Sequence, residues 1–253
     1  KIRASIRFKH FKKTYDENIL DIKGGLNDVV MNNSPIDIDK LIEGTNEILT
    51  ANRNSLQLFD MLHSMRQFDD LTYVHSVNVA LIASILGQWL KFSEKDIRIL
   101  TISGLLHDIG KIMIPNEILT KPGKLTVAEY NIMKQHVNFG YEKVKNQNID
   151  IRIKEACLLH HEKCDGTGYP FGLKSDHIPA VAKIIAIADV YDAMTSARVY
   201  RGALCPFEVI DTMYKDAFTK FEPEYILPFL KNVASSYINN DVRLSDGRIG
   251  KVV

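Results

Sequence analysis

The segment from Leu105 to Lys111 places a histidine and an aspartate side by side at the end of an otherwise apolar helix. His107 and Asp108 are side chains of a metal-binding type. Gly110 is expected to end the helix, so that Lys111 turns back over the same spot. Taken alone, the pair is explained equally well by a helix that merely ends in polar residues. The rest of the chain must therefore decide between these two interpretations.

Apolar residues recur at three- and four-residue steps over most of the chain, which predicts an all-α protein. One long helix is expected to run from Asp37 into the core. Capping boxes begin helices at Ser93 and Thr126, and the second of these helices is expected to end near His136. Further helices are expected over residues 71–91 and 151–161, and after Pro179, Pro206 and Pro223. Because only residues 242–253 have a strand pattern, with a turn at Asp246-Gly247, the predicted fold is a helical bundle with an N-terminal linker helix and a short C-terminal β-hairpin.

The composition is that of a globular protein without a strong charge of one sign. The 253 residues are 45% hydrophobic and 25% charged, with a formal net charge of +1. Nothing draws the whole protein to duplex nucleic acid or to an anionic membrane, so any recognition of phosphate must be local. The longest apolar run, Val79 to Leu90, is about half a membrane span. The cysteines form no CxxC pair, which fits a reducing compartment, so we expect a cytoplasmic protein. If an N-terminal region is missing, the chain is expected to be part of a larger sensor protein.

A set of histidines and aspartates shares one peculiarity, which is that each falls in or at the end of a strongly apolar helix. The set comprises His75, His107, Asp108, His136, His160, His161 and Asp189. A buried polar side chain needs a partner, because unpaired burial costs on the order of several kcal/mol. For any single histidine ordinary packing is a sufficient explanation, but for the set divalent metal is the economical partner. The set has more ligands than one ion uses, so we expect two ions with Asp108 as the bridging carboxylate.

The types of ligand indicate the metal and the reaction. Imidazole and carboxylate without a thiolate motif suit iron, manganese, nickel or zinc. Two such ions about 3.5–4 Å apart hold a hydroxide nucleophile and stabilise an in-line displacement at phosphorus, so we expect phosphoester hydrolysis. The sequence has no P-loop, no G-x-S-x-G elbow and no dinucleotide fingerprint. Lys111, Arg198 and Arg201 are placed to bind phosphate, although a solvated helix end explains the two arginines equally well.

These residues resemble the HD-GYP proteins, the bacterial branch of the HD phosphohydrolase superfamily that hydrolyses cyclic di-GMP. The resemblance covers about residues 68–221 and rests on motifs in the family's order, namely His75, the block His107 to Lys111, His136, the run His160 to Pro170, and Ile187-Ala188-Asp189. It implies that one metal is held by His75, His107, Asp108 and Asp189, and the other by Asp108, His136, His160 and His161. It also implies that Asp108 and Lys111 are catalytic, and that Lys111, Tyr169, Arg198 and Arg201 contact the substrate. The loop Gly168-Tyr169-Pro170 is the namesake of the family and meets partner proteins in some members.

The chain departs from the family's pattern at three positions. Leu71 stands where some members have a glutamate that binds a third ion, so two ions are expected here. Cys164 stands where the family usually has tryptophan, and Val199 where proline is common. The last two changes concern the fit of the substrate rather than the metal centre.

The resemblance implies a phosphodiesterase that opens cyclic di-GMP to linear pGpG, or onward to GMP. The alternatives are a phosphohydrolase for another cyclic dinucleotide or nucleotide, and a sensor module that binds cyclic di-GMP without hydrolysing it. The expected organisation is an N-terminal segment and linker helix over residues 1–67, as a truncated regulatory region, a metal-bearing domain over 68–240, and a hairpin tail over 241–253. Residues 1–33, with a break at Gly24-Gly25, have no assigned function, and a homodimer through the N-terminal helix is a further expectation.

Overall fold

The fold was obtained as a computed structural model, which describes residues 5–52, 55–65, 71–196, 204–238, 241–243 and 246–253. The α-helices are α1 Ile6–Asn32, α2 Ile38–Ala51, α3 Ser55–Ser64, α4 Leu71–Trp89, α5 Glu94–Leu106, α6 Asn116–Leu119, α7 Val127–Lys134, α8 His136–Val144, α9 Ile151–Leu159, α10 Ala180–Thr195, α11 Pro206–Asp216 and α12 Pro223–Ser236. Two short strands, β1 Asp241–Arg243 and β2 Ile249–Lys251, pair antiparallel near the C-terminus. The prediction of an all-α protein with a C-terminal β-hairpin is confirmed.

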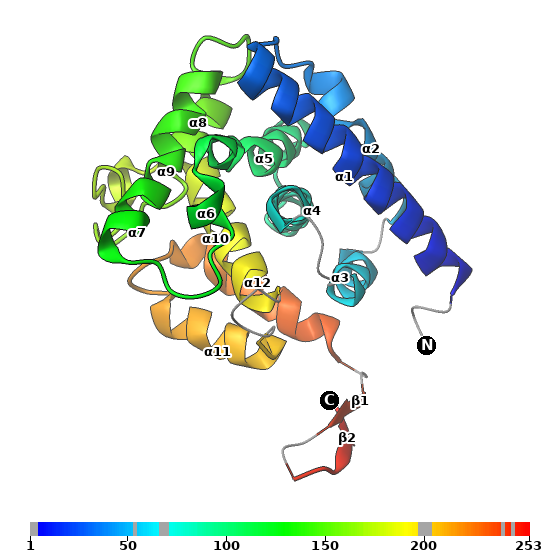
Figure 1. The fold of residues 1–253 in the computed structure, drawn as a ribbon. Coiled ribbons are helices and arrows are strands. Elements are labelled where there is room, and N and C mark those ends of the chain that lie inside the picture. The colour runs from blue at the N-terminus through cyan, green and yellow to red at the C-terminus, as the bar shows by residue number, and fades with distance from the viewer. Residues whose placement is uncertain (1–4, 53–54, 66–70, 197–203, 239–240, 244–245) are drawn as a thin grey trace.

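Helix α4 lies at the centre of the bundle (Figure 1). Its sequence is rich in Val, Ala, Leu and Ile and has no proline, and most of its side chains are buried. It packs against α5 and α10, and also against α1, α2 and α12. The contact with α5 depends on Gly104, because a Cβ at this position would lie 2.4 Å from the Cα of Ala80. This close approach brings the C-terminal end of α5, and with it His107, next to α4.

The N-terminal region differs from the expectation in two respects. Residues 1–33 were expected to be broken at Gly24-Gly25, but α1 runs through both glycines from its cap at Ser5. It does so because Phe11, Tyr15 and Ile22 lie on one face of the helix and are buried in a core that extends to α12. The long helix expected from Asp37 is divided into α2 and α3. The expected domain boundary at residue 67 falls on residues 66–70, which lie outside the described residues.

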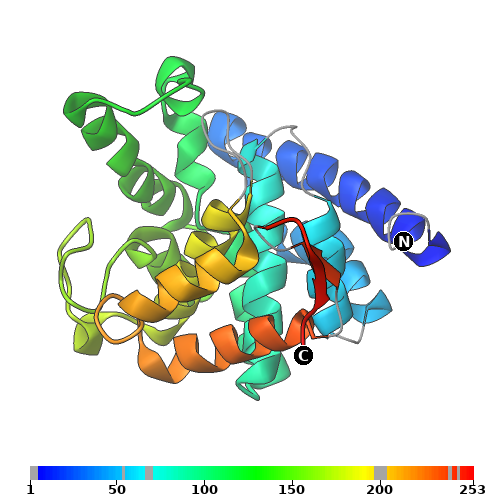
Figure 2. The same cartoon turned by 90° about the horizontal axis from the view of Figure 1, so that it is seen from below.

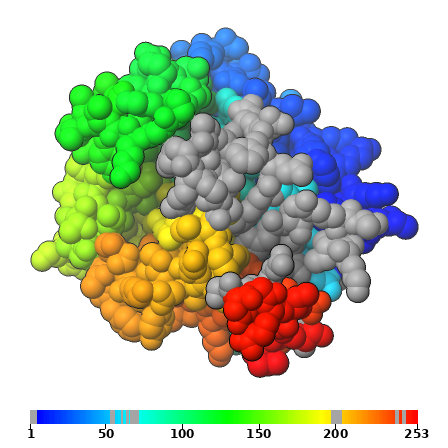
Figure 3. Space-filling model, turned by 60° about the horizontal axis from the view of Figure 1, so that its bottom comes forward, coloured from blue at the N-terminus to red at the C-terminus, as the bar shows by residue number. Residues whose placement is uncertain are grey.

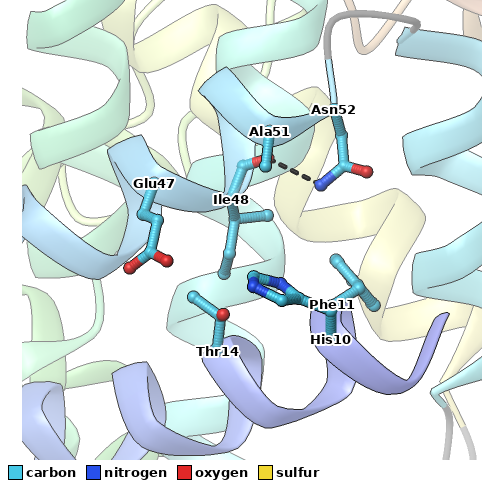
Figure 4. Close-up of a pocket in the computed structure, with 7 residues that line it drawn as sticks. All are labelled: His10, Phe11, Thr14, Glu47, Ile48, Ala51 and Asn52. Carbon is cyan, nitrogen blue, oxygen red and sulfur yellow. Dashed lines mark hydrogen bonds between the residues drawn. The ribbon is translucent and has the colours of Figure 1, made fainter. Parts of the chain in front are cut away.

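A small pocket lies where α1 packs against α2 (Figure 4). It is lined by His10, Phe11, Thr14, Glu47, Ile48, Ala51 and Asn52. The Asn52 side chain donates to the Ile48 carbonyl oxygen at 2.8 Å and so closes the last turn of α2. The pocket contains none of the residues expected to bind metal, and it marks a local gap in the packing of α1.

Sequence signals for the ends of the helices are confirmed at most positions. Thr126 and Glu129 form a complete capping box at the start of α7, and the Ser93 side chain accepts from the Asp96 amide at the start of α5. The α7 helix ends at Lys134, however, and His136 begins the next helix, α8. Pro179 directly precedes α10 as expected.

The C-terminal hairpin lies at the edge of the bundle. Seen from below, α12 (orange) runs across this side of the molecule with the hairpin (red) beside it (Figure 2), and in the space-filling view the hairpin forms a separate knob (Figure 3). Its turn contains Gly247 at a φ of +88°, a conformation that suits glycine. Among the described residues, no helix combines the length and the apolar character needed to cross a membrane.

Candidate metal centre

The seven residues expected to bind metal come from five segments of the chain and meet beside the central helix. His75 lies on α4, His107 and Asp108 follow α5, His136 begins α8, His160 and His161 follow α9, and Asp189 lies within α10. Two groups have ligand atoms within 4.8 Å of one another, namely His75, His107 and Asp108, and Asp108, His136, His160 and His161. Asp108 belongs to both groups. This His/Asp cluster is able to bind metal.

Gly110 has a different role from the one expected. The α5 helix ends at Leu106, and a 3-10 helix, Ile109–Met113, runs through Gly110, so Gly110 does not end the α-helix. A Cβ at Gly110 would lie 2.0 Å from the carbonyl oxygen of His136 and 2.5 Å from the amide nitrogen of Gly140. Only glycine therefore lets α8 approach closely enough to place His136 beside Asp108.

Backbone carbonyl groups fix the orientation of three of the imidazole rings. His107 Nδ1 lies 2.8 Å from the Gly104 carbonyl oxygen, and His136 Nδ1 lies 2.7 Å from that of Met133. His160 Nδ1 is 2.9 Å from the Ala156 carbonyl oxygen. Since a carbonyl group only accepts, each Nδ1 must carry the proton, and each Nε2 keeps its lone pair for a ligand bond.

The Asp108 carboxylate faces both groups of histidines. Its Oδ1 lies 3.2 Å from His136 Nε2 and 3.8 Å from His160 Nε2. Its Oδ2 lies 3.2 Å from His107 Nε2 and 3.5 Å from His75 Nε2. One oxygen is thus directed to each group, which is the arrangement required of a bridging carboxylate.

The Asp189 carboxylate also lies close to histidines of both groups. Its Oδ1 is 3.0 Å from His75 Nε2, and its Oδ2 is 3.7 Å from His161 Nδ1. The resemblance implies that Asp189 belongs to the group of His75, His107 and Asp108. The geometry places it next to a histidine of each group.

Two buried atoms support the fit of a cation to this cluster. Within the described part of the chain, His107 Nε2 and Asp108 Oδ1 have no hydrogen-bond partner, although both are shielded from water. An unpaired buried acceptor costs on the order of 1–3 kcal/mol. Because both atoms offer lone pairs toward the centre of the cluster, a divalent cation would supply the missing partner.

The protonation states of the ligands also suit a cation. Burial raises the pKa of Asp108, but His107 and the Lys111 ammonium outweigh this effect and hold that pKa well below its usual range. Burial lowers the pKa of His160 well below its ordinary value and that of His161 to about 3. These two imidazoles are therefore neutral, as metal ligands must be.

His75 is protonated when no metal ion is bound, in contrast to His160 and His161. Burial lowers its pKa, but the contacts with Asp189 and Asp192 outweigh burial and raise the pKa to about 9. The proton on His75 supplies a positive charge among carboxylates. A metal ion would supply the same charge in its place.

The residues expected to contact the substrate are only partly described. The Lys111 ammonium donates to Asp108 Oδ2, with the Lys111 side chain 19% exposed. The Tyr169 ring stacks on the His161 ring at 4.7 Å between centroids and 29° between planes. Arg198 and Arg201 lie in residues 197–203, outside the described residues.

Sequence reasoning missed two polar residues that hold the site. Asp192 Oδ2 lies 2.7 Å from His75 Nδ1 and orients that ring. The spacing of three residues between Asp189 and Asp192 was a usable signal, since it puts both on one face of a helix. Glu162 is the second residue, and its role is visible only in the folded structure.

Glu162 holds the loop that contains Tyr169. Its buried carboxylate accepts from the amides of Phe171 (2.7 Å), Gly172 (3.1 Å) and Leu173 (2.8 Å). At the other end of the loop, a Cβ on Gly168 would lie 2.4 Å from the Lys163 amide nitrogen, so the loop folds back tightly at this glycine. These contacts place the Tyr169 ring against His161.

Glu162→Gln is expected to lower the free energy of unfolding by about 1.5–3 kcal/mol, because amide–carboxylate hydrogen bonds are lost and a carboxamide NH₂ would face backbone donors. Urea denaturation measures this change, and hydrogen exchange should become faster at the amides of residues 171–173. Glu117→Gln, at an exposed position on α6, serves as the control. Unchanged stability and exchange in the Glu162 variant would contradict this role.

Comparisons with known proteins show the family and agree with the fold. The family model described as HD domain matches residues 42–225. Cyclic di-GMP phosphodiesterase PA4108 from Pseudomonas aeruginosa is 37% identical over 190 residues, which cover 75% of this chain and 46% of that protein. The 3'3'-cGAMP-specific phosphodiesterase 2 from Vibrio cholerae is 30% identical over 216 residues, which cover 84% of this chain and 40% of that protein. The chain thus spans less than half the length of either relative.

A solved structure has the same fold. Bd1817, an HDG"Y"P protein from Bdellovibrio bacteriovorus, superposes with a TM-score of 0.73 over 91% of this chain and 73% of that chain. The two sequences are 17% identical, so the likeness concerns the fold.

Proposed function

This chain belongs to the HD-domain family and carries the motifs of its HD-GYP branch, and from this premise we propose that it is a metal-dependent phosphodiesterase that opens cyclic di-GMP to linear pGpG. The observation that carries the proposal is the position of Asp108, whose two oxygens face two separate groups of histidines. That arrangement fits a two-metal centre, and two-metal centres catalyse in-line displacement at phosphorus.

Two divalent ions would be held by the seven residues of the cluster. His75, His107 and Asp108 would hold one ion, and Asp108, His136, His160 and His161 the other, with Asp189 beside both groups. Iron or manganese suits these nitrogen and oxygen ligands best, and nickel or zinc is the alternative. When bound, such ions generate a nucleophile at neutral pH and stabilise negative charge on a phosphoryl group.

The chain's own residues would orient the substrate around this centre. Lys111 puts a positive charge beside Asp108, where a phosphate oxygen could accept from it. Tyr169 covers the exposed side of His161 and offers an aromatic surface next to the ligands. His160 and His161 remain neutral, so these two side chains can bind a cation and do not themselves donate protons to the leaving group.

Arg201→Ala is expected to weaken binding of cyclic di-GMP and to leave the metal content unchanged. A guanidinium group has no lone pair for a cation but matches phosphate oxygens in a bidentate fork. Losing one such contact should cost about 1.5–3 kcal/mol, on the order of tenfold to a hundredfold in affinity. Calorimetry with cyclic di-GMP and elemental analysis measure both quantities on one sample.

Arg248→Ala, in the C-terminal hairpin, is the matched control for Arg201→Ala. Equal affinities of the Arg201 variant and the wild type would show that this arginine does not contact the substrate, in agreement with the alternative of a solvated helix end. Lost metal would instead give it a structural role in the site.

The proposed activity is tested by offering metal-loaded protein a panel of cyclic di-GMP, 3'3'-cGAMP and mononucleotides. Elemental analysis on the same preparation counts the ions per chain. Conversion of cyclic di-GMP to pGpG, with two ions per chain, supports the proposal. Turnover of mononucleotides but not of cyclic di-GMP would reject it, and tight binding without turnover would make the chain a sensor module.

A second candidate substrate is 3'3'-cGAMP, because a relative specific for it matches 84% of this chain. The two dinucleotides differ in one base and have the same phosphodiester groups, so the metal centre alone would not distinguish them. A ratio of kcat/KM values that favours 3'3'-cGAMP in the same panel would assign that substrate instead.

We also propose a cytoplasmic location, since the proposed substrate is a nucleotide and the cysteines have no pairing pattern. The loop Gly168-Tyr169-Pro170 is proposed as a contact for a partner protein, because Phe171 beside it is 63% exposed. The outer face of α1 is proposed as a homodimer contact, since it exposes Ile6 and Leu20.

A further inference from the structure

Helix α1 lies outside the family match, which begins at residue 42, yet it packs directly on the helix that carries His75. In Figure 1 it runs along the side of the bundle next to α4. Its C-terminal end is tied to α8, because the Lys143 ammonium donates to the Val30 carbonyl oxygen (2.8 Å) and to Asn33 Oδ1 (2.9 Å). Helix α1 therefore contacts the helices that supply His75 and His136.

A chain of buried hydrogen bonds runs from α1 to the metal centre. The Tyr15 hydroxyl donates to Asn78 Oδ1, and Asn78 Nδ2 donates to Asp192 Oδ1 at 2.9 Å. Asp192 Oδ2 in turn lies 2.7 Å from His75 Nδ1. Tyr15 is 2% exposed, Asn78 6% and Asp192 2%, so water does not compete for these bonds.

We propose that Tyr15 and Asn78 are positioning residues for the metal ligand His75, so that α1 sets the affinity of the centre for metal. Asp192 holds the Nδ1 proton of His75 and leaves Nε2 for the ion. Asn78 holds Asp192 in place, and Tyr15 holds Asn78. The inference rests on the proposed metal centre but not on the proposed substrate.

The direction of each bond explains why the hydroxyl group of Tyr15 matters. A carboxylate only accepts, so the Asn78 amide must turn its NH₂ group toward Asp192 and its oxygen away from it. The Tyr15 hydroxyl donates to that oxygen, and so satisfies the buried amide and holds the side chain in this position. Without the hydroxyl, the buried Asn78 oxygen loses this donor, and the side chain that holds Asp192 is less firmly fixed.

A second donor contacts the same oxygen of Asp192 as Asn78 does. Ser196 Oγ donates to Asp192 Oδ1 at 3.2 Å, and the Ser196 amide donates to the Asp192 carbonyl oxygen at 2.8 Å. The effect of losing Tyr15 should therefore be partial. Direct partners of a histidine ligand, such as Asp192 here, typically contribute about 10- to 100-fold to metal affinity. Tyr15 lies two hydrogen bonds further out, so we expect its contribution to be at the lower end of this range, about tenfold.

The test is a manganese titration of Tyr15→Phe, a substitution that removes the hydroxyl and keeps the ring packed against Phe11. We expect the affinity for manganese to fall about tenfold relative to the wild type. Isothermal titration calorimetry measures the affinity, and elemental analysis after dialysis at a fixed free manganese concentration checks it. Neither measurement depends on turnover.

Tyr73→Phe is the matched control. The Tyr73 hydroxyl donates to Asn27 Oδ1 at 3.1 Å, so this variant also removes one tyrosine hydrogen bond between α4 and α1, but one that does not lead to Asp192. We expect it to lower the melting temperature about as much as Tyr15→Phe does while leaving the affinity for manganese unchanged. Equal loss of affinity in both variants would overturn the proposal, because packing of α1 alone would then be responsible.

A double-mutant cycle with Asn78→Ala tests the order of the residues. Once Asn78 is gone, Tyr15→Phe should have no further effect on the affinity for manganese. Independent, additive losses would overturn the relay, as would an unchanged affinity in Tyr15→Phe. A wild-type protein that binds manganese but hydrolyses no cyclic dinucleotide would reject the proposed function, and the titrations would still decide this inference.

Discussion

Replacement of Asp108 by alanine is expected to abolish the binding of both metal ions. Its Oδ1 lies 3.2 Å from His136 Nε2 and its Oδ2 3.2 Å from His107 Nε2, so one side chain serves both groups of histidines. Loss of a ligand shared by both ions should lower each affinity, and with it any activity that needs two ions. Elemental analysis of purified Asp108→Ala, loaded with manganese and dialysed, should give less than one ion per chain.

Two further variants make the Asp108 experiment decisive. His136→Ala removes a ligand from only one group, and should therefore leave the ion beside His75 and His107 in place. Asp176→Ala, at an exposed position in the short 3-10 helix Ser175–His177 before α10, should retain both ions. If Asp108→Ala holds two ions per chain, Asp108 is not the bridge and the carboxylate of Asp189 would have to take that role.

The helices that the sequence predicts well are those whose signals are local. Pro206 and Pro223 stand at the first positions of α11 and α12, and Thr126 forms its capping box with Glu129 three residues on. Such signals involve residues within one turn, so the chain reveals them before it folds. The apolar run of α4 is equally clear, because a helix that is apolar on all sides must lie in the core.

The errors arise where a contact between distant segments overrides the local signal. Gly24 and Gly25 would weaken an isolated helix, but burial of Tyr15 and Ile22 on the side facing the core holds α1 straight through them. Gly110 suggests a helix end, although its lack of a side chain serves the approach of α8. The packing partner of each segment, the core for α1 and α8 for Gly110, cannot be predicted from the glycine alone.

In the candidate site too, local patterns reveal some residues, and contacts between distant segments determine the others. Its ligand types were recognisable because histidine and aspartate are out of place in apolar helices. The residues that orient the ligands were harder to recognise, since their partners are far away in the sequence, and only the spacing of Asp192 from Asp189 gave a signal. Asp192 holds His75 from 117 positions further on, and Tyr15 reaches Asn78 across 63 positions. Only the packing of α1, α4 and α10 brings these groups together.

Gly110→Ala is expected to damage both stability and metal binding. The new Cβ would lie 2.0 Å from the His136 carbonyl oxygen, whereas an ordinary contact is at least 3.4 Å. A carbonyl oxygen within a helix cannot rotate away, so α8 as a whole must move outward and take His136 with it. Overpacking of this kind costs about 1–3 kcal/mol or more, and the displaced His136 should lower the affinity for the ion that it shares with His160 and His161.

Gly24→Ala is the matched control for this glycine, because nothing lies within 4 Å of a Cβ at that exposed position in α1. It should raise the free energy of unfolding by about 0.5–1 kcal/mol, as alanine favours the helix over glycine. Urea denaturation of metal-free protein separates the two variants by sign, and a manganese titration then tests whether Gly110→Ala loses one ion more easily than the other. A Gly110 variant as stable as the wild type, with both ions bound equally tightly, would show that α8 can give way without moving His136, and the close approach would then have no part in placing that ligand.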